Sequence, residues 1–279
     1  MEAKKTCDMH THSVFSDGTA ASAEIVQEAV RIGLSAVALT DHNTLAGLPA
    51  FLQAADKTIW AVPGVEITAD YAGDEIHIVG LFIQPAVYAP LTDFLSRIQA
   101  RKKQANEDAC ARLMRAGYAI SSERVLSTAG NINRVHFAKE LMRCGYVASV
   151  DEAFSKLLAP EHGLYIPSRR LDGFEVIDCL RQLGIAPVLA HPFLDLTAAQ
   201  LQDFLPKAKK AGLVGMETRY SLFGETETQS AEALAQAYGL LPGGGSDYHG
   251  DNKPGNCIGT GYGDLQVPLS YLEQLERAN

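Results

Sequence analysis

The sequence predicts an α/β protein built as a barrel of seven strands, with an all-helical insertion. Short apolar runs alternate with helical stretches over most of the 279 residues, which is typical of strands joined by helical crossovers in a mainly parallel sheet. This alternation stops for about seventy residues between the fourth and fifth runs. Histidine and carboxylate residues follow or close the runs, as catalytic residues do at the C-terminal ends of barrel strands.

The predicted strands are short apolar runs. In chain order they are Thr6–His10, Ala36–Thr40, Ile59–Ile67, Glu75–Ile83, Ile185–Ala190, Leu213–Thr218 and Leu240–Gly243. The predicted helices lie between most of these runs and are Ala21–Ile32, Leu45–Ala55, Phe174–Leu183, Ala198–Ala211 and Thr226–Tyr238. Seven strands predict a barrel that is one strand short of the usual eight.

The interrupted region predicts three further helices and a separate domain. These helices are Leu91–Ala116, Ile132–Arg143 and Val150–Leu158. Residues 98–171 contain twelve Lys and Arg against seven Asp and Glu, a charge of +5, whereas the rest of the chain carries −14. We therefore predict a barrel of residues 1–96 and 172–279 and a basic helical cap of residues 97–171, projecting from the end of the barrel that holds the metal ligands.

The amino-acid composition limits the classes to which this protein can belong. The chain is 47% hydrophobic, enough for a real core, and no segment approaches the roughly 20 apolar residues of a membrane span. The N-terminus has no apolar stretch typical of a signal peptide, so we expect a soluble, cytoplasmic protein without membrane or obligate protein partners. Five scattered cysteines without a C-x-x-C pair predict reduced, mostly buried thiols.

The histidines indicate a metal centre. His10 and His12 are two residues apart in an extended segment, so their imidazoles lie on one face, roughly 7 Å apart along the strand. Asp247 and His249 repeat this spacing near the other end of the chain. The remaining candidate ligands lie at or near predicted strand ends and are Asp17, His42, Glu66, His77 and His191. Imidazoles and carboxylates without thiolates suit manganese, iron(II) or zinc.

The order His-x-His, Asp, Asp-His, Glu, His, His-Pro, Asp-x-His resembles the PHP family, named after DNA polymerases and histidinol phosphatases. The resemblance implies a distorted (β/α)7 barrel with two or three divalent metal ions, Mn²⁺ favoured and Zn²⁺ or Fe²⁺ as alternatives. It assigns His10, His12, Glu66 and Asp247 to a first ion, and Asp17, His42 and His249 to a second. Glu66 also bridges to a third ion, completed by His77 and His191. Many relatives have His where Asp17 stands.

Such a centre has a defined chemistry. Two ions about 3.5–4 Å apart share a water, lower its pKa and hold the attacking and leaving oxygens of a phosphoryl group. The metal-bound water is then the nucleophile, which predicts phosphate ester hydrolysis without a covalent intermediate. Asp41 adjoins His42 in sequence, and we expect it to orient that imidazole without binding metal itself.

The insertion resembles one branch of the family. The segment from Asn133 through Arg134 and His136 to Ala138 is similar to that branch's Arg-Pro-His-hydrophobic-Ala segment, with Val135 in place of Pro. Leu164–Arg169 is similar to its Tyr-Val-Pro element. The branch acts on 3′,5′-bisphosphonucleotides such as pAp and on the 5′ ends of short RNA. Arg134 and Arg169 would then bind the phosphate that is not cleaved.

Other residues are candidates for the same pocket or have alternative interpretations. Arg170 is an alternative to Arg169, His136 a candidate substrate contact, and Arg219 and Tyr220 follow the sixth strand and are candidates to line the pocket. Glu75 lies two residues before His77 and is an alternative ligand, but we interpret it as a strand-edge charge. We interpret the glycine run Gly243–Gly245 as room for backbone beside the metals.

The function that these residues predict is a metal-dependent phosphomonoesterase that removes the 3′ phosphate of 3′,5′-bisphosphonucleotides and leaves a 5′-mononucleotide. A 5′–3′ exoribonuclease acting on short 5′-phosphorylated RNA is a second hypothesis. A histidinol-phosphate phosphatase and a non-catalytic metal-binding regulatory module are further alternatives.

Overall fold

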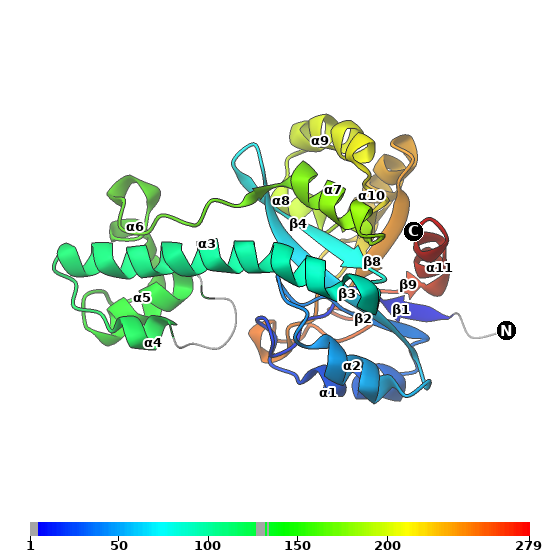
Figure 1. The fold of residues 1–279 in the computed structure, drawn as a ribbon, viewed down its shortest axis with the longest axis horizontal. Coiled ribbons are helices and arrows are strands. Elements are labelled where there is room, and N and C mark those ends of the chain that lie inside the picture. Colours follow the sequence, from blue (N-terminus) through cyan, green and yellow to red (C-terminus); the bar gives the residue numbers. More distant parts are fainter. Residues whose placement is uncertain (1–4, 127–131, 133) are drawn as a thin grey trace. The chain divides into compact units, whose positions relative to one another are not determined.

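The computed structural model describes residues 5–126, 132 and 134–279 (Figure 1). Its strands are β1 (Thr6–Asp8), β2 (Ala36–Leu39), β3 (Trp60–Tyr71), β4 (Asp74–Leu81), β5 (Leu171–Asp172), β6 (Ala186–Leu189), β7 (Gly215–Tyr220), β8 (Leu241–Gly245) and β9 (Val267–Pro268). Its α-helices are α1 (Ser22–Arg31), α2 (Leu48–Ala55), α3 (Tyr88–Arg115), α4 (Ser122–Leu126), α5 (Arg134–Arg143), α6 (Val150–Lys156), α7 (Gly173–Gln182), α8 (Pro192–Asp195), α9 (Ala198–Ala211), α10 (Glu225–Ala237) and α11 (Leu269–Arg277). Asn133 lies outside the described residues.

The strands form one sheet that curls into a nearly closed, distorted barrel, which confirms the predicted fold class. The strand order is β8-β7-β6-β4-β3-β2-β1-β9, with β5 beside β3. Strands β8 and β1 approach one another, since the Met9 N–H donates to the Gly244 carbonyl at 3.2 Å. Five of the strand pairs are parallel, including β1 with β2 and β7 with β8.

The direction of β4 differs from the expected mainly parallel arrangement. It follows β3 through a tight turn at Ala72 and Gly73, both with positive φ, and pairs antiparallel with β3 and β6. The start of β4 therefore lies at the edge of the sheet where its parallel neighbours end. This explains why His77, near the start of its strand, reaches the same edge as ligands that follow other strands.

All seven predicted strands are present. Strands β2 and β6 are buried at every position, and such continuous apolar runs are typical of parallel strands covered on both faces. The predicted barrel helices are also present, with ends that differ by at most three residues. Sequence analysis missed β5 and β9, of two residues each, and α4, α8 and α11. The two short strands and the short helices α4 and α8 carry little periodic signal, but α11, of nine residues, is as long as helices that were predicted.

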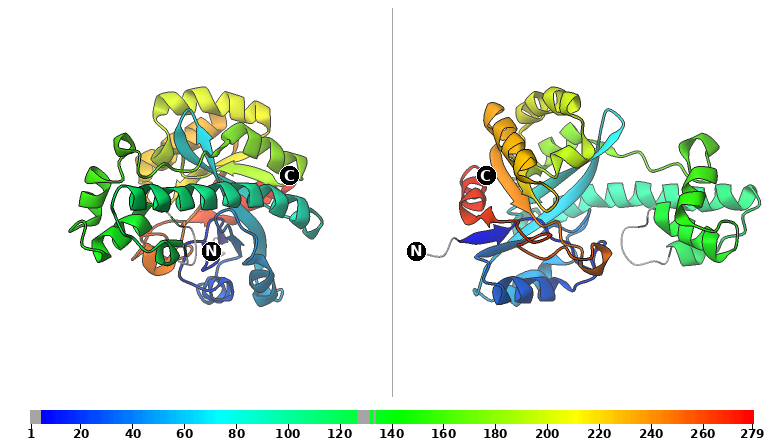
Figure 2. Two further views of the ribbon diagram at one scale, coloured as in Figure 1. Left: turned by 60° about the vertical axis from the view of Figure 1, so that its left-hand side comes forward. Right: turned by 180° about the vertical axis from the view of Figure 1, so that it is seen from behind.

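The barrel helices cover the sheet in groups. Helices α1 and α2 pack together beside β2 and β3, whereas α7 and α9 pack together beside β3, β4 and β6 (Figures 1 and 2). Ile25, Val26 and Ala29 of α1 are buried, the spacing of one helix face. At its start, the Glu24 carboxylate accepts the Ala21 N–H at 2.8 Å. The core so formed supports the strand ends from which the site is built.

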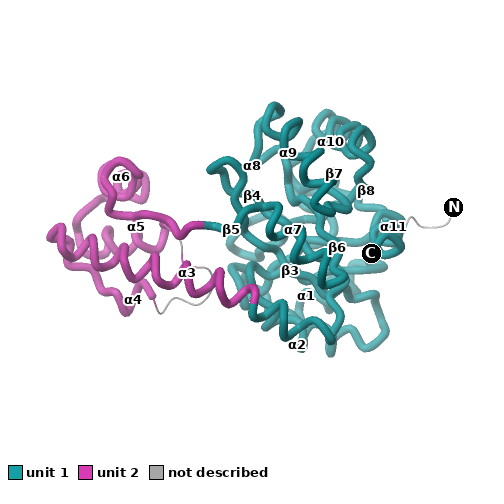
Figure 3. The backbone as a smooth tube through the Cα atoms, turned by 45° about the horizontal axis from the view of Figure 1, so that its top comes forward, with its two compact units in different colours: residues 1–93, 170–279 teal, residues 94–169 magenta. Residues whose placement is uncertain are grey.

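The chain divides into two compact units, residues 1–93 with 170–279 and residues 94–169 (Figure 3). The second unit has its own apolar cluster, which includes Leu113, Phe137, Ala138 and Leu141, all fully buried. Its predicted helices correspond to α3, α5 and α6. The assignment of residues 97–171 as a substrate cap stays a prediction.

The apolar cluster of the second unit gives a first testable prediction. Phe137 is fully buried and its ring lies 5.2 Å from that of Tyr165. Replacing it by alanine removes the ring and leaves a cavity, so we expect Phe137→Ala to destabilise this unit by about 3–5 kcal/mol. Hydrogen exchange of α5 amides measures this, and unchanged protection in α5 would contradict it. Exchange in β2 of the first unit is the internal control.

Two expectations from composition are tested by the structure. No helix in the described ranges combines the length and apolar character that crossing a membrane requires. The structure shows no disulfide between the described cysteines, but only Cys7 and Cys110 are buried and Cys257 is exposed. The expectation of mostly buried thiols is therefore wrong for the other three.

Candidate metal centre

The buried carboxylate of Glu66 is the focus of the candidate centre. Glu66 lies within β3 and is 1% exposed. Its Oε2 lies 3.2 Å from His10 Nε2, 3.2 Å from His12 Nε2 and 3.1 Å from His42 Nδ1. Its Oε1 lies 3.0 Å from His77 Nδ1 and 3.2 Å from His191 Nε2. One side chain therefore faces five imidazoles from several segments of the chain.

His10, His12, Glu66 and Asp247 form the first cluster of possible ligand atoms. Asp247 Oδ1 lies 3.6 Å from His10 Nε2 and 3.3 Å from His12 Nε2. The backbone at Gly245 lies close to His10, as the glycine run predicts. A Cβ on Gly245 would lie 2.5 Å from the His10 Cβ. A side chain at Gly245 would displace His10, so the glycine is required here.

Asp17, His42 and His249 form the second cluster, together with His12. Asp17 Oδ1 lies 3.2 Å from His249 Nε2 and 3.8 Å from His12 Nδ1, and Asp17 Oδ2 lies 3.7 Å from His42 Nε2. The ligand atoms of these four residues all lie within 4.8 Å of one another. Asp17 is a third exposed, so this cluster is the most open to solvent of the three.

His77 and His191 form the third cluster with Glu66 Oε1. The two imidazoles approach at 3.4 Å, from His77 Nδ1 to His191 Nε2. The register of β3 and β4 pairs Glu66 with Val79 and Thr68 with His77, which makes Glu66 and His77 diagonal neighbours on one face of the sheet. Asp195, which sequence analysis missed, lies 3.0 Å from His191 Nδ1 and belongs to this group.

The residues present fit bound metal ions. The structure brings all nine predicted ligands into overlapping groups whose ligand atoms lie within 4.8 Å of one another. Among the described residues, His10 Nε2, His12 Nε2, His42 Nδ1 and Asp17 Oδ1 are buried and lie 3.1–3.2 Å from a neighbouring ligand atom, but none of them makes a hydrogen bond of acceptable geometry. Buried polar atoms are almost always paired, so unpaired lone pairs that converge from different strands indicate a place for cations.

Several partners that hold these ligands were missed by sequence analysis or interpreted differently. Glu75, interpreted as a strand-edge charge, is exposed near the start of β4 and also accepts from His77 Nε2 at 3.1 Å. Glu217 lies 2.9 Å from His10 Nδ1. Lys253 Nζ lies 2.5 Å from Asp247 Oδ2. The Glu75–His77 contact has a local signal, because residues at i and i+2 of a strand share a face. The contact of Glu217 with His10 depends on the folded sheet, and short sequence motifs contain no signal for it.

Tyr220 lines the centre, as expected for a residue that follows the sixth strand. Its hydroxyl donates to Asp247 Oδ2 at 2.7 Å, and its ring lies 5.4 Å from that of His191. Burial and the Asp247 carboxylate raise the pKa of Tyr220 far above its usual value. Tyr220 therefore remains protonated at neutral pH and keeps Oδ2 occupied, which leaves Asp247 Oδ1 to face the imidazoles.

The contacts of Asp41 differ from its predicted role beside His42. Its Oδ1 accepts from the Ser13 N–H at 2.7 Å and the Ser16 hydroxyl at 2.8 Å, and its Oδ2 from the Ser13 hydroxyl at 2.7 Å. Asp41 thus fixes the turn between His12 and Asp17 rather than the imidazole of its neighbour. His42 forms a parallel bridge with Glu66 just beyond β2, and adjacent side chains in such extended backbone point to opposite faces.

The predicted substrate residues belong to both units. Arg170 lies at the centre's edge, because its Nη2 pairs with Glu75 Oε2 at 2.5 Å and Glu75 holds His77. Arg134, His136 and Arg169 belong to the second unit and are described within it. There the guanidinium of Arg134 lies 4.1 Å from the ring centroid of Phe154.

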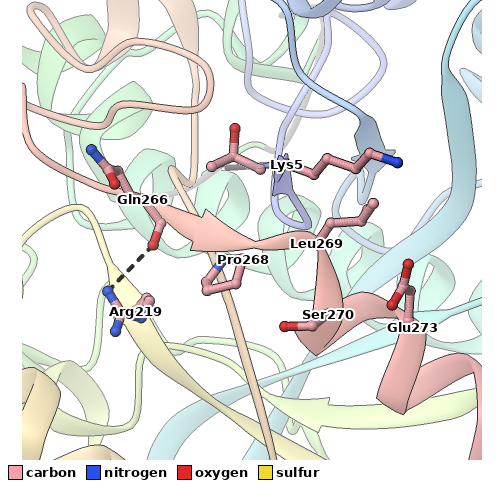
Figure 4. A pocket seen from close by; sticks show the side chains of 8 residues that line it. Lys5, Arg219, Gln266, Pro268, Leu269, Ser270 and Glu273 are labelled. Atoms are coloured by element: carbon pink, nitrogen blue, oxygen red, sulfur yellow. Dashed lines mark hydrogen bonds between the residues drawn. The ribbon is translucent and has the colours of Figure 1, made fainter. Parts of the chain in front are cut away.

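Arg219 is turned away from the clustered ligands. A bulge between Glu217 and Arg219 shifts the register of β7, so the two side chains do not share a direction despite their i, i+2 spacing. Its guanidinium donates to Glu232 and to the Gln266 carbonyl, beside a pocket of about 470 Å³ that Lys5 also lines (Figure 4). The structure does not bring Arg219 to the metal centre.

The cluster shifts the ionisation of its members in opposite directions. Burial opposes charge on His77, but Glu66 and Glu75 outweigh it and raise the pKa of His77 to about 10. Burial likewise opposes charge on His12 and His191, and neighbouring carboxylates raise each pKa to about 9. Burial opposes charge on Glu66 too, but the surrounding imidazoles hold its pKa well below its usual value.

These shifts predict how the metal-free protein responds to pH. Histidines with a raised pKa stabilise the fold fully below about pH 6.5 and lose this contribution as pH rises through about 9–10. The lowered carboxylate pKa values stabilise it above about pH 4.5 and lose this contribution on acidification. Burial lowers the pKa of His42 to about 3, so the contribution of that imidazole is complete above about pH 6.5 and is lost on acidification. We therefore expect metal-free stability to be highest near pH 6.5 and to fall both towards pH 10 and towards pH 4. Urea unfolding in chelator measures it, and flat or rising stability from pH 6.5 to 9 would contradict it.

Comparison with known proteins agrees with this geometry. The PHP domain matches residues 8–162 of the chain. The chain is similar to the 5′-3′ exoribonuclease Rnm of Salmonella typhimurium, with 32% identity over 87% of this chain and 84% of the relative. It is also similar to the 3′,5′-nucleoside bisphosphate phosphatase of Chromobacterium violaceum, with 28% identity over 90% of each chain.

A solved structure shares the whole fold. A protein from Bifidobacterium adolescentis, assigned as a metal-dependent phosphoesterase, superposes with a TM-score of 0.78 and 25% identity, over 99% of this chain and 96% of that one. The domain match covers more than half of the chain, and the candidate ligands occur in the order that the family resemblance implies. The chain therefore belongs to the PHP domain family and is a metal-dependent phosphoesterase.

Proposed function

We propose that this protein hydrolyses the 3′ phosphate of 3′,5′-bisphosphonucleotides such as pAp and releases a 5′-mononucleotide and phosphate. The observation that carries the proposal is the convergence of eight imidazole and carboxylate groups around Glu66. We further propose Mn²⁺ as the resident ion, since nitrogen and oxygen donors without thiolates suit it. When bound, the ions supply Lewis-acid polarisation of phosphoryl oxygens and lower the pKa of water.

The chain's own residues orient the substrate and hold the ligands. Glu75 fixes the Arg170 guanidinium, whose planar fork suits bidentate contact with a phosphate. Lys253, a third exposed, places a second cation beside Asp247. Arg134 and Arg169 of the basic second unit are the proposed contacts for the 5′ phosphate, and His136 is a further candidate contact. A bisphosphonucleotide carries two phosphates, which gives both sets of cationic side chains a proposed role.

A 5′–3′ exoribonuclease is the second candidate, and the similarity to the Salmonella exoribonuclease at 32% identity favours it. An exonuclease that releases 5′-mononucleotides breaks the same bond, between phosphorus and the 3′ oxygen. Chemically, pAp corresponds to the first nucleotide of a 5′-phosphorylated RNA, except that no further nucleotide is attached to its 3′ phosphate. The same centre serves both reactions, and the room available beyond the 3′ phosphate distinguishes them.

Assays on matched substrates separate the candidates. The Mn²⁺-reconstituted protein is incubated with pAp and with 5′-phosphorylated RNA of two to five nucleotides, and 5′-hydroxyl RNA serves as the control. We expect kcat/KM for pAp to exceed that for the oligonucleotides at least about tenfold, equivalent to about 1.4 kcal/mol of transition-state stabilisation. Degradation of RNA without hydrolysis of pAp would favour the exoribonuclease, and inactivity on both would remove the nucleotide assignment.

A further inference from the structure

Glu217 is not a candidate metal ligand, but its carboxylate contacts two residues that are. It lies on β7, is 2% exposed, and its carboxylate reaches residues that follow two other strands. Oε1 lies 2.9 Å from His10 Nδ1, after β1, and Oε2 accepts the backbone N–H of His191, after β6, at 2.7 Å. Each carboxylate oxygen of Glu217 therefore contacts one candidate ligand residue. Neither oxygen belongs to a group of possible ligand atoms.

The first contact determines which nitrogen of His10 is available. An imidazole that binds a cation through Nε2 must carry its proton on Nδ1. A carboxylate that faces Nδ1 stabilises this tautomer and fixes the ring plane. His10 is fully buried and its Nε2 has no hydrogen-bond partner in the described part of the chain. Glu217 therefore directs the His10 lone pair towards Glu66 Oε2 and Asp247 Oδ1.

The second contact holds the backbone of His191. This residue has φ 23° and ψ 57° at the junction of β6 and α8, in the left-handed region that a side chain makes unfavourable. Such a conformation persists only where the surroundings hold it. The short hydrogen bond to Glu217 Oε2 holds it, and so places His191 Nε2 at 3.2 Å from Glu66 Oε1.

We propose that Glu217 is a positioning residue that sets the geometry of two neighbouring ion sites at once. His10 faces the Glu66 Oε2 side of the centre and His191 the Oε1 side. A carboxylate can accept from both N–H groups, but the amide that Glu217→Gln introduces has only one oxygen. In either orientation of that amide, its NH₂ faces a donor. One orientation favours the wrong His10 tautomer and the other removes the support of the His191 backbone.

The test measures ion binding rather than turnover. Metal-free protein is titrated with Mn²⁺, and free Mn²⁺ is followed by its electron paramagnetic resonance signal. We expect Glu217→Gln to weaken Mn²⁺ binding about 10–100-fold, with the secondary structure of the metal-free protein unchanged by circular dichroism. Glu217→Asp, which keeps the charge but is too short to span both donors, is expected to lose a similar amount.

The matched control is Glu232→Gln on α10. Its carboxylate accepts from Arg219 and Tyr271 outside the centre, at 3.1 and 3.0 Å, so we expect Mn²⁺ affinity within about twofold of the unchanged protein. Equal Mn²⁺ affinity for all three variants would overturn the role of Glu217. The inference rests on the proposed metal centre: absence of Mn²⁺ binding in the unchanged protein would sink that centre, whereas normal binding by the Glu217 variants sinks only this inference.

A measurement on the unchanged protein keeps the inference testable if the variants do not fold. Long-range ¹H–¹⁵N spectra of the Zn²⁺-loaded protein report the tautomer of each imidazole, and the signal missing from His10→Gln identifies His10. We expect its proton on Nδ1, protected from exchange by Glu217. A proton on Nε2 would overturn the proposal without any Glu217 variant.

Discussion

Glu66→Gln is expected to lower phosphoesterase kcat/KM on the order of a thousandfold and to reduce the bound Mn²⁺. The carboxylate oxygens face five imidazoles at 3.0–3.2 Å, so no other described residue of the centre joins as many ligands. An amide keeps the shape but removes the negative charge and replaces one acceptor by a donor. A thousandfold decrease in kcat/KM corresponds to the loss of about 4 kcal/mol of transition-state stabilisation, since each tenfold change is about 1.4 kcal/mol.

Kinetics and elemental analysis on one preparation test this expectation. Metal content by mass spectrometry separates loss of the ions from loss of catalysis with the ions still bound. Glu276→Gln is the matched control, because Glu276 is an exposed carboxylate on α11, and we expect wild-type activity and metal content. Activity within tenfold of wild type together with full metal content in Glu66→Gln would contradict the central role of this residue.

Chelation of the metal is expected to abolish activity and to destabilise the first unit. A ligand that binds only the folded state at 100 to 1,000 times its Kd adds about 3–4 kcal/mol to the free energy of unfolding. All nine candidate ligands belong to residues 1–93 and 170–279. We therefore expect EDTA to lower the unfolding free energy of that unit by this amount and to leave the core around Phe137 unaffected.

Calorimetry with EDTA, and then with excess Mn²⁺, measures this effect and its reversal. Hydrogen exchange in β2 and in α5 assigns the loss of stability to one unit or the other. Equal Tm values with EDTA and with Mn²⁺, or loss of protection in α5 alone, would argue against ions bound at the Glu66 centre. Recovery of activity with Mn²⁺ but not Zn²⁺ would support the proposed resident ion.

Local sequence patterns predict most strands and helices of the barrel. Strands β2 and β6 are buried apolar runs, so a few residues suffice to recognise them. The i, i+2 spacing of His10 and His12 is equally local, and their imidazole rings lie 5.1 Å apart. The ligand order along the chain was readable for the same reason, and the structure brings all nine residues together. Local patterns do not predict the two-residue strands β5 and β9, nor do they predict the direction of β4.

What only the tertiary structure decided is how distant residues meet. Glu217 and His10 are 207 positions apart, and their contact depends on the strand order and register of the whole sheet. The bulge in β7 turns Arg219 outward, although its spacing from Glu217 predicts the same face. Asp41 holds Ser13 and Ser16 rather than its neighbour His42. Sequence by itself determined the ligand types and their strands, because periodicity acts over a few residues. The partners that orient those ligands depend on contacts between strands, which exist only once the sheet has closed.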